Sequence, residues 1–178
     1  MSAVKVTAVN IAGLWYGETS TITEDLTGAK LAELLKSYKQ VENIHQDTWT
    51  IEESEASQDT YKNQLTRATY RMGAKTMGDV TFNWTIGQYD YATKAAFMGG
   101  TATDTSWKRS RGVTDVNKVL VAKTEDGQYC VLPKASISGR EALTDGAIGI
   151  AVKGTMLEPD NTAVCPEYWF DESEVKEA

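Results

Sequence analysis

The stretch DVTFNWTIGQYDYATKAAFMGGTATDTSW, residues 79–107, decides the fold of this chain. Apolar residues alternate with polar or small ones over residues 80–87, which is the period-two pattern of a strand with one buried face. Asp90 is a predicted N-cap for a short helix over residues 91–98, and Gly99-Gly100 is the predicted stop. A helix of about eight residues is too short to persist in water unaided. We therefore expect it to pack on a sheet.

The composition is that of an ordinary globular domain with a preference for β-structure. The chain has 178 residues, of which 41% are hydrophobic and 24% charged, with fourteen glycines and three prolines. We expect residues 1–178 to form a single domain. It would carry a helical insertion at about 22–42 and an acidic tail at about 167–178.

Charge and cysteine usage exclude several classes of protein. The net charge of -7 argues against a simple nucleic-acid binder, which would neutralise phosphates with a basic patch. The opening residues MSAVKVTAVN do not resemble a secretory signal, and no apolar run approaches the ~18 residues of a membrane span. Cys130 and Cys165 are expected to be buried free thiols in a reducing compartment. Synthesis in the cytoplasm, with no membrane association, is the resulting expectation.

The N-terminal third is predicted to contain one strand and one amphipathic helix. Alternating apolar residues over 4–11 predict a strand that ends in a loop at residues 13–17. A helix is predicted over residues 30–38, where apolar side chains recur at the spacing of one helical face: Leu31, Leu34, Leu35 and Tyr38. This helix should cover the core.

A long hairpin with an acidic tip is predicted next. Its arms would be residues 48–53 and 61–72, with Trp49, Ile51 and Leu65 on one face. The connection EESEASQD, residues 52–59, is too charged to be buried. Its acidic side chains should face solvent or lie on an assembly surface: Glu52, Glu53, Glu55 and Asp59.

The C-terminal half is predicted to be all strand. Residues 125–127 (EDG) form a hairpin turn, residues 119–122 are apolar enough to be covered on both faces, and Pro133 marks an edge or a bend. Residues 147–155 form another strand, with inward side chains Ile148, Ile150 and Val152. The predicted fold is mainly β, an antiparallel β-sandwich or barrel flanked by one main helix and one short helix.

Motifs for catalysis, metals or cofactors are absent. His45 is the single histidine, and no GxSxG elbow, HExxH, CxxC, EF-hand or phosphate loop is present. We expect no enzyme activity, no cofactor and no metal. The basic cluster beside Trp107, which contains Lys108, Arg109 and Arg111, indicates a subunit contact or a solvated loop. A second candidate contact is the aromatic patch of Tyr168, Trp169 and Phe170.

The order strand, Tyr89-Asp90, short helix, Phe97-Met98-Gly99-Gly100 and then Trp107 resembles the tail tube proteins of long-tailed bacteriophages. The hairpin VLVAKT-EDG-QYCVLPKASIS and the strand EALTDGAIGIAVKGTMLEPDN are similar to the two closing elements of such subunits. The resemblance covers roughly residues 45–161 and extends in fold to the tubes of contractile injection systems.

This resemblance implies a structural subunit of a phage or prophage tail. Such subunits form hexameric rings that stack into a hollow tube, and a long hairpin or loop contacts the neighbouring ring. The implied partners are further copies of this chain, other tail proteins such as the tape measure and terminator, and DNA that passes through an acidic lumen without specific binding. The implied location is the host cytoplasm during assembly and then the virion tail.

A β-sandwich module that binds carbohydrate or another ligand is the alternative. Five tryptophans and eight tyrosines could supply a stacking platform for sugar rings. Because Trp49 and Trp84 fall on predicted inward faces, we expect most of this aromatic content to lie in the core.

Overall fold

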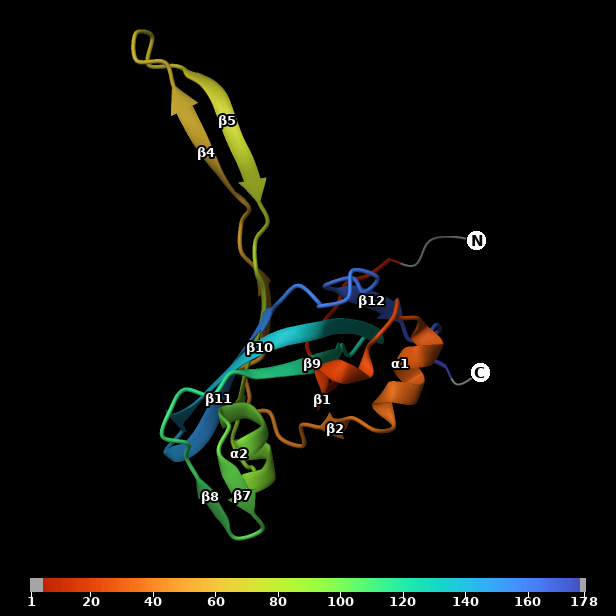
Figure 1. The fold of residues 1–178 in the computed structure, drawn as a ribbon. Coiled ribbons are helices and arrows are strands. Elements are labelled where there is room, and N and C mark those ends of the chain that lie inside the picture. The colour runs from red at the N-terminus through yellow and green to blue at the C-terminus, as the bar shows by residue number, and fades with distance from the viewer. Residues whose placement is uncertain (1–4, 177–178) are drawn as a thin grey trace.

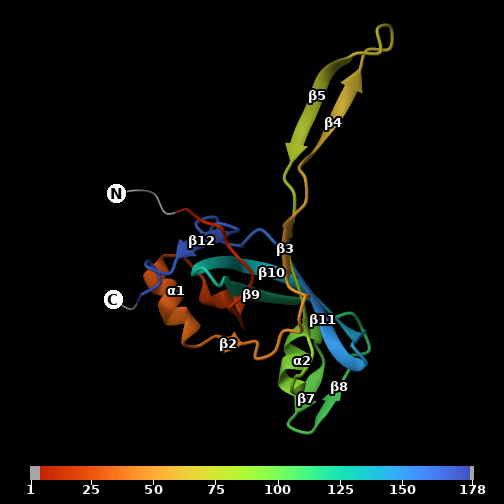
Figure 2. The ribbon, with the colours of Figure 1, turned by 180° about the vertical axis from the view of Figure 1, so that it is seen from behind.

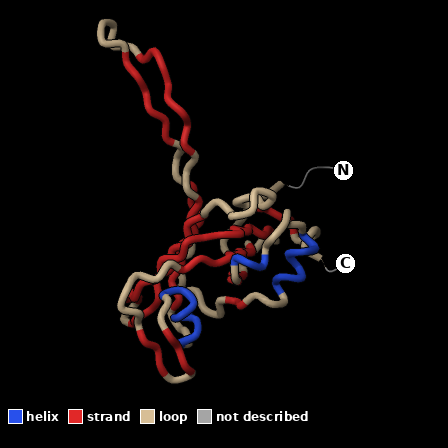
Figure 3. The backbone as a smooth tube through the Cα atoms, in the orientation of Figure 1, coloured by secondary structure: helices blue, strands red, loops and turns tan. Residues whose placement is uncertain are grey.

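The computed structural model describes residues 5–176 and shows a mainly antiparallel β fold with two α-helices and a long projecting hairpin (Figures 1 and 3). The N-terminal elements are β1 (Gly13–Gly17), a 3-10 turn η1 (Thr19–Thr21), α1 (Gly28–Leu35) and β2 (Lys39–Gln40). The middle elements are β3 (Thr50–Glu53), β4 (Ser57–Lys62), β5 (Thr69–Thr76), β6 (Val80–Ile86) and α2 (Tyr91–Met98). The remaining strands are β7 (Thr101–Thr103), β8 (Ser106–Lys108), β9 (Val116–Lys123), β10 (Gln128–Thr144), β11 (Ala147–Met156) and β12 (Tyr168–Asp171).

One large sheet forms the body of the protein. Its strands follow the order β2-β1-β9-β10-β11-β6-β3, and β12 also pairs with β10. Two separate hairpins complete the pairing, β4 with β5 and β7 with β8. All pairings are antiparallel. The predicted class, mainly antiparallel β-structure with two helices, is confirmed.

The strand and short helix within residues 79–107 fold as predicted. In β6 every second side chain is buried, and the Asp90 carboxylate accepts a 2.6 Å hydrogen bond from the Thr93 amide to cap α2. Gly99 and Gly100 end the helix at φ 68° and 90°, values that favour glycine. The helix packs on the sheet through Phe97, which is 1% exposed. Its packing explains how so short a helix is stable.

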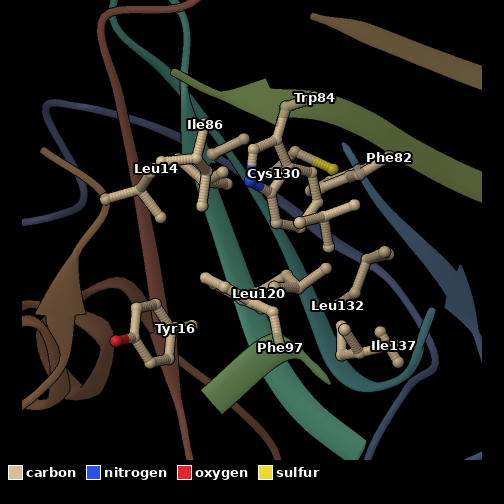
Figure 4. Close-up of a cluster of buried hydrophobic side chains, with 14 of the residues drawn as sticks. Leu14, Tyr16, Phe82, Trp84, Ile86, Phe97, Leu120, Cys130, Leu132 and Ile137 are labelled. Carbon is tan, nitrogen blue, oxygen red and sulfur yellow. The ribbon is translucent and has the colours of Figure 1, made fainter. Parts of the chain in front are cut away.

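Two hydrophobic clusters lie on opposite faces of β9. Leu120 and Ala122 point into the larger cluster, which also contains the aromatic rings of β6 and α2 (Figure 4). Val119 and Val121 point into the smaller cluster, beneath α1 and β12. The prediction that residues 119–122 are covered on both faces is confirmed. Within the larger cluster, the Phe97 ring lies 5.6 Å from Trp84 in an edge-to-face contact.

Pro133 marks the point where β10 changes partners. Residues 128–131 pair with β12, residues 135–144 pair with β11, and the register with β9 shifts between Leu132 and Ala135. A proline has no amide to donate, so the irregularity accommodates it. The predicted bend is confirmed, but β10 is a central strand and not an edge.

Several predictions for the N-terminal third are wrong. Residues 5–11 form no strand, Val6 is 56% exposed, and the predicted loop at residues 13–17 is strand β1; Val4 lies outside the described residues. The helix spans Gly28–Leu35, so Tyr38 lies beyond its end, although its ring is still buried. In the C-terminal part, the predicted acidic tail of residues 167–178 contains strand β12 (Tyr168–Asp171), which pairs with β10, and residues 177–178 lie outside the described residues.

Two predictions of burial also fail. Ile148 was expected to point inward but is 63% exposed, because it pairs with Leu143 near the free end of the β10–β11 hairpin. Ile150 and Val152 are buried as expected. Cys130 is a buried free thiol, whereas Cys165 is free but exposed. Burial raises the pKa of the Cys130 thiol well above its usual range, and nearby Glu167 acts in the same direction.

Candidate functional site

The feature that distinguishes this protein is the projection formed by residues 54–79, which we call the arm. It continues the pairing of β3 with β6 out of the body: Glu53 is opposite Val80 in that ladder, and Ser57 is opposite Thr76 in the next (Figures 1 and 2). At an extended rise of about 3.3 Å per residue, its rising side below the turn, residues 54–62, spans about 30 Å. It touches no other element of the body along most of this length (Figure 2).

Hydrogen bonds and backbone geometry between nearby residues define both ends of the arm. At the base, the Ser54 hydroxyl accepts a 2.8 Å hydrogen bond from the Asp79 amide, and Gly78 lies so close to Ser54 that no Cβ would fit. At the tip, the Asn63 carboxamide oxygen accepts a 2.9 Å hydrogen bond from the Leu65 amide. Arg67 adopts a left-handed φ of 62°, which closes the turn. These interactions at its base and tip therefore stabilise the arm as a hairpin.

The position of the acidic residues differs from the prediction. The tip is the turn between Lys62 and Thr69, and residues 52–59 lie at its base and on its rising strand. All four predicted acidic residues are exposed, on β3, on β4 or between them: Glu52, Glu53, Glu55 and Asp59. Leu65 was expected to share a face with Trp49 but lies at the tip and is 92% exposed. Trp49 packs against Phe82, 5.2 Å between ring centroids.

Large apolar side chains on the arm are exposed. Tyr70, Met72 and Met77 are 67%, 51% and 76% exposed. Every residue of β4 is exposed, and in β5 only Gly73 is partly covered. On one face the Arg71 guanidinium lies 4.1 Å from the centre of the Tyr61 ring. Tyr70 and Met72 alternate with Arg71 and therefore lie on the opposite face.

The outer part of the arm is basic, a feature that sequence reasoning missed. Residues 60–78 contain four of the chain's 18 Lys and Arg residues and none of its 25 Asp and Glu residues, so they carry +4 while the rest carries -11. The four cations are Lys62, Arg67, Arg71 and Lys75. A count of charge by segment, in place of the whole chain, would have revealed them.

Two of the first group of predicted contact residues, Trp107 and Arg109, make contacts within the subunit. The Trp107 ring lies 4.5 Å from the Lys94 ammonium and 5.1 Å from the Arg109 guanidinium, and its indole N–H donates to the Gly99 carbonyl. Lys94 is 7% exposed and donates a 2.6 Å hydrogen bond to Glu141, which holds the pKa of that carboxyl below its usual range. This cluster fixes the β7–β8 hairpin to α2. Lys108 and Arg111 remain exposed.

The aromatic patch is divided between the two faces of β12. Tyr168 and Phe170 stack with their ring centroids 5.8 Å apart and pack against the smaller cluster. Trp169 points the other way and is 43% exposed. Of the five tryptophans, all within the described residues, Trp169 alone is exposed by this measure. The geometry therefore offers no platform of several exposed tryptophan rings.

Groups that could support chemistry are sparse. The His45 imidazole and the Asp145 carboxylate are 2.7 Å apart, on a body loop and at the β10–β11 turn. A surface hollow of about 670 Å³, lined in part by Tyr16, Glu42 and Asp90, contains no histidine, cysteine or serine. Within residues 5–176, no group of three His, Cys, Asp or Glu residues is arranged to hold a metal ion.

Comparison with known proteins adds no family: no family model matches the chain, and no curated protein matches its sequence. Among the described residues, no helix has the length and apolar character needed to cross a membrane. The arm and the exposed residues near it thus remain the strongest candidate site.

Proposed function

We propose that this protein is a structural subunit that assembles with copies of itself into rings that stack as the tube of a phage or prophage tail. The observation that carries the proposal is the arm, a two-stranded hairpin with no covering element. The resemblance of residues 45–161 to tail tube proteins supports the same conclusion. The β-structured body would form the ring, and the arm would reach a neighbouring copy.

The energetics of the arm favour a partner. An isolated two-stranded hairpin is only marginally stable in water, because it buries little apolar surface and both of its edges expose backbone groups. Here the two strands also expose Tyr70, Met72 and Met77. Contact with another copy would bury these side chains and pair the free edges. A second copy is the simplest partner, because every subunit carries the same arm and the same free edges.

The charge balance supports a conduit. The chain as a whole carries -7, and a surface of that sign repels the phosphates of DNA. Hexameric rings with DNA passing through the lumen are the arrangement implied by the resemblance. The tape measure and terminator would be its other partners, first in the host cytoplasm and then in the virion tail.

Assembly of the purified protein tests the proposal. The wild-type chain should form rings or tubes in negative-stain images and a concentration-dependent increase of mass in light scattering. A variant with residues 57–76 replaced by Asn-Gly should remain monomeric, because it lacks the arm but retains the body. Its near-ultraviolet circular dichroism, which reports the buried Trp84 environment, should match the wild type.

Two results would contradict the proposal. A wild-type protein that stays monomeric at several milligrams per millilitre would contradict the proposed self-assembly. Assembly that survives loss of residues 57–76 would show that the arm is not required for self-assembly. A matched control shortens the β7–β8 hairpin at its turn, residues 104–105, which should leave assembly intact.

A further inference from the structure

The arm has two edges of opposite charge. The rising side, β3 together with the rising part of the arm (residues 50–62), contains four acidic residues and one lysine, whereas the tip and descending side, residues 63–79, contain three cations and one acid, Asp79 at the base. We call the first the acidic edge, formed by Glu52, Glu53, Glu55 and Asp59, and the second the basic edge, formed by Arg67, Arg71 and Lys75. Within residues 5–176, none of these seven side chains forms a salt bridge.

The backbone of both edges is also unpaired. Strand β4 pairs only with β5, and β3 is the last strand of the large sheet, so the β3–β4 side has no neighbour. The outer side of β5 is free for the same reason. A row of unpaired amides and carbonyls can accept another strand. Each edge therefore combines free backbone groups with an excess of charge of one sign.

We propose that the acidic edge of one copy pairs with the basic edge of the next, so that neighbouring arms lie side by side in one antiparallel sheet. The inference rests on the proposed self-assembly and names the surfaces that meet. Because β4 rises and β5 descends, arms that point the same way bring β4 against the neighbour's β5 in antiparallel orientation. A contact between two different edges repeats around a ring, which a contact of like edges would not.

The faces to which Asp59 and Arg71 point agree with this pairing, whereas Lys75, which is opposite Gln58, points to the other face. The Asp59 side chain lies beside Gly73 on the facing strand, and Tyr61 is opposite Arg71 in the ladder. Because Asp59 and Tyr61 are two residues apart in β4, Asp59 and Arg71 point to the same face. Faces are preserved when a sheet is extended by another strand. Asp59 of one arm and Arg71 of the next would therefore share a face, and opposite charges placed across strands are favourable.

Charge reversal of each edge provides the test. Arg71→Glu with Lys75→Glu gives an arm with two acidic edges, and Glu55→Lys with Asp59→Lys gives an arm with two basic edges. Each variant alone should need about ten-fold or more higher concentration to assemble, because pairs of opposite charge become pairs of like charge. A one-to-one mixture of the two should recover assembly near the wild-type concentration, with the two variants alternating.

The mixture is informative because misfolded variants would not rescue one another. Lys5→Glu with Lys176→Glu is the matched control for Arg71→Glu with Lys75→Glu, since both lysines are exposed outside the arm and the net charge falls by the same amount. Its assembly should be unchanged. If the wild type assembles and both edge variants do so equally well, or if the mixture assembles no better than either variant, the edge pairing is wrong while self-assembly stands.

Nucleic acid is the other partner that a basic edge could bind. The wild type should give no mobility shift with duplex DNA at physiological salt, as expected if its cations contact a neighbouring subunit. A shift that Arg71→Glu with Lys75→Glu abolishes, with assembly unaffected, would assign the basic edge to DNA and overturn the inference.

Discussion

Strands β5 and β6 are consecutive in the chain and lie in ladders of the same antiparallel kind, yet their surroundings are opposite. In β6 the side chains of Val80, Phe82, Trp84 and Ile86 are at most 5% exposed. In β5 seven of the eight residues are exposed. Since burial of apolar area is the main favourable contribution to folding, β6 is held by its own subunit, whereas β5 depends on what it meets outside.

The largest effect should come from the body. Phe97→Ala removes a ring that is 1% exposed and contacts both Tyr16 and Trp84. We expect the free energy of unfolding to fall by about 3–5 kcal/mol, from lost burial and from the cavity left behind. Urea denaturation followed by tryptophan fluorescence measures this. A loss below about 1 kcal/mol would show that the body does not depend on α2 as described.

Next in size is the contact of Glu141 with the nearly buried Lys94. Glu141→Gln should cost about 1–2 kcal/mol, because Lys94 keeps its charge but loses its carboxylate, and the exposure of Glu141 moderates the effect. The pKa of Glu141 is lowered by folding, so its contribution is present above the unfolded pKa and lost as pH falls through the folded pKa.

The variant should therefore show a weaker loss of stability on acidification than the wild type. Thermal melts between neutral and acid pH would measure the difference. Parallel curves for the two proteins would exclude this role for Glu141.

A smaller effect is expected at the cap of α2. Asp90→Ala removes the acceptor for the Thr93 amide and should cost about 1 kcal/mol. Asp90→Asn retains a capping oxygen and should cost less. The amide hydrogen bond lowers the pKa of Asp90, so the difference in stability between the wild type and Asp90→Ala should be largest near neutral pH and shrink as pH falls through the folded pKa. Equal stabilities at neutral pH would contradict the capping role.

The smallest effect is expected on the arm of the monomer. Tyr70→Ser should change the free energy of unfolding by no more than about 0.5 kcal/mol, because this side chain is 67% exposed. Amide exchange in β4 and β5 should be fast in the monomer and slow after assembly, whereas exchange in β6 should be slow in both. A monomer with slow exchange in the arm would remove the contrast between the two regions.

The parts of the fold that sequence could predict are those with local chemical signals. The alternation in β6, the Asp90 cap and the glycine at position 127, with φ of 83°, each specify their own geometry. Strand β1 was mistaken for a loop because glycines flank it. In the structure these glycines leave room for rings: Trp15 lies over Gly13, and Tyr38 lies over Gly17. Such a role depends on contacts that sequence spacing does not show.

The candidate site was harder to predict because its strands lack a buried face. Without alternation, nothing in residues 57–76 fixed the register, and the acidic run was mistaken for the turn. The turn itself, Asn63 to Ala68, contains only modest turn signals. The side chains of a segment that binds a partner are matched by side chains of a second molecule, so the sequence of one chain shows only one side of that match.

The continuity of the arm with β3 and β6 also has a consequence for the order of folding events. Pairing Ile51 with Phe82 directly would require closure of a loop of about thirty residues, which carries an entropic cost. A hairpin that forms first at the short turn, on a scale of about 1–10 μs, can extend pair by pair toward the body. The arm would then deliver β3 to β6 already aligned, which lowers the effective contact order of the sheet's last strand.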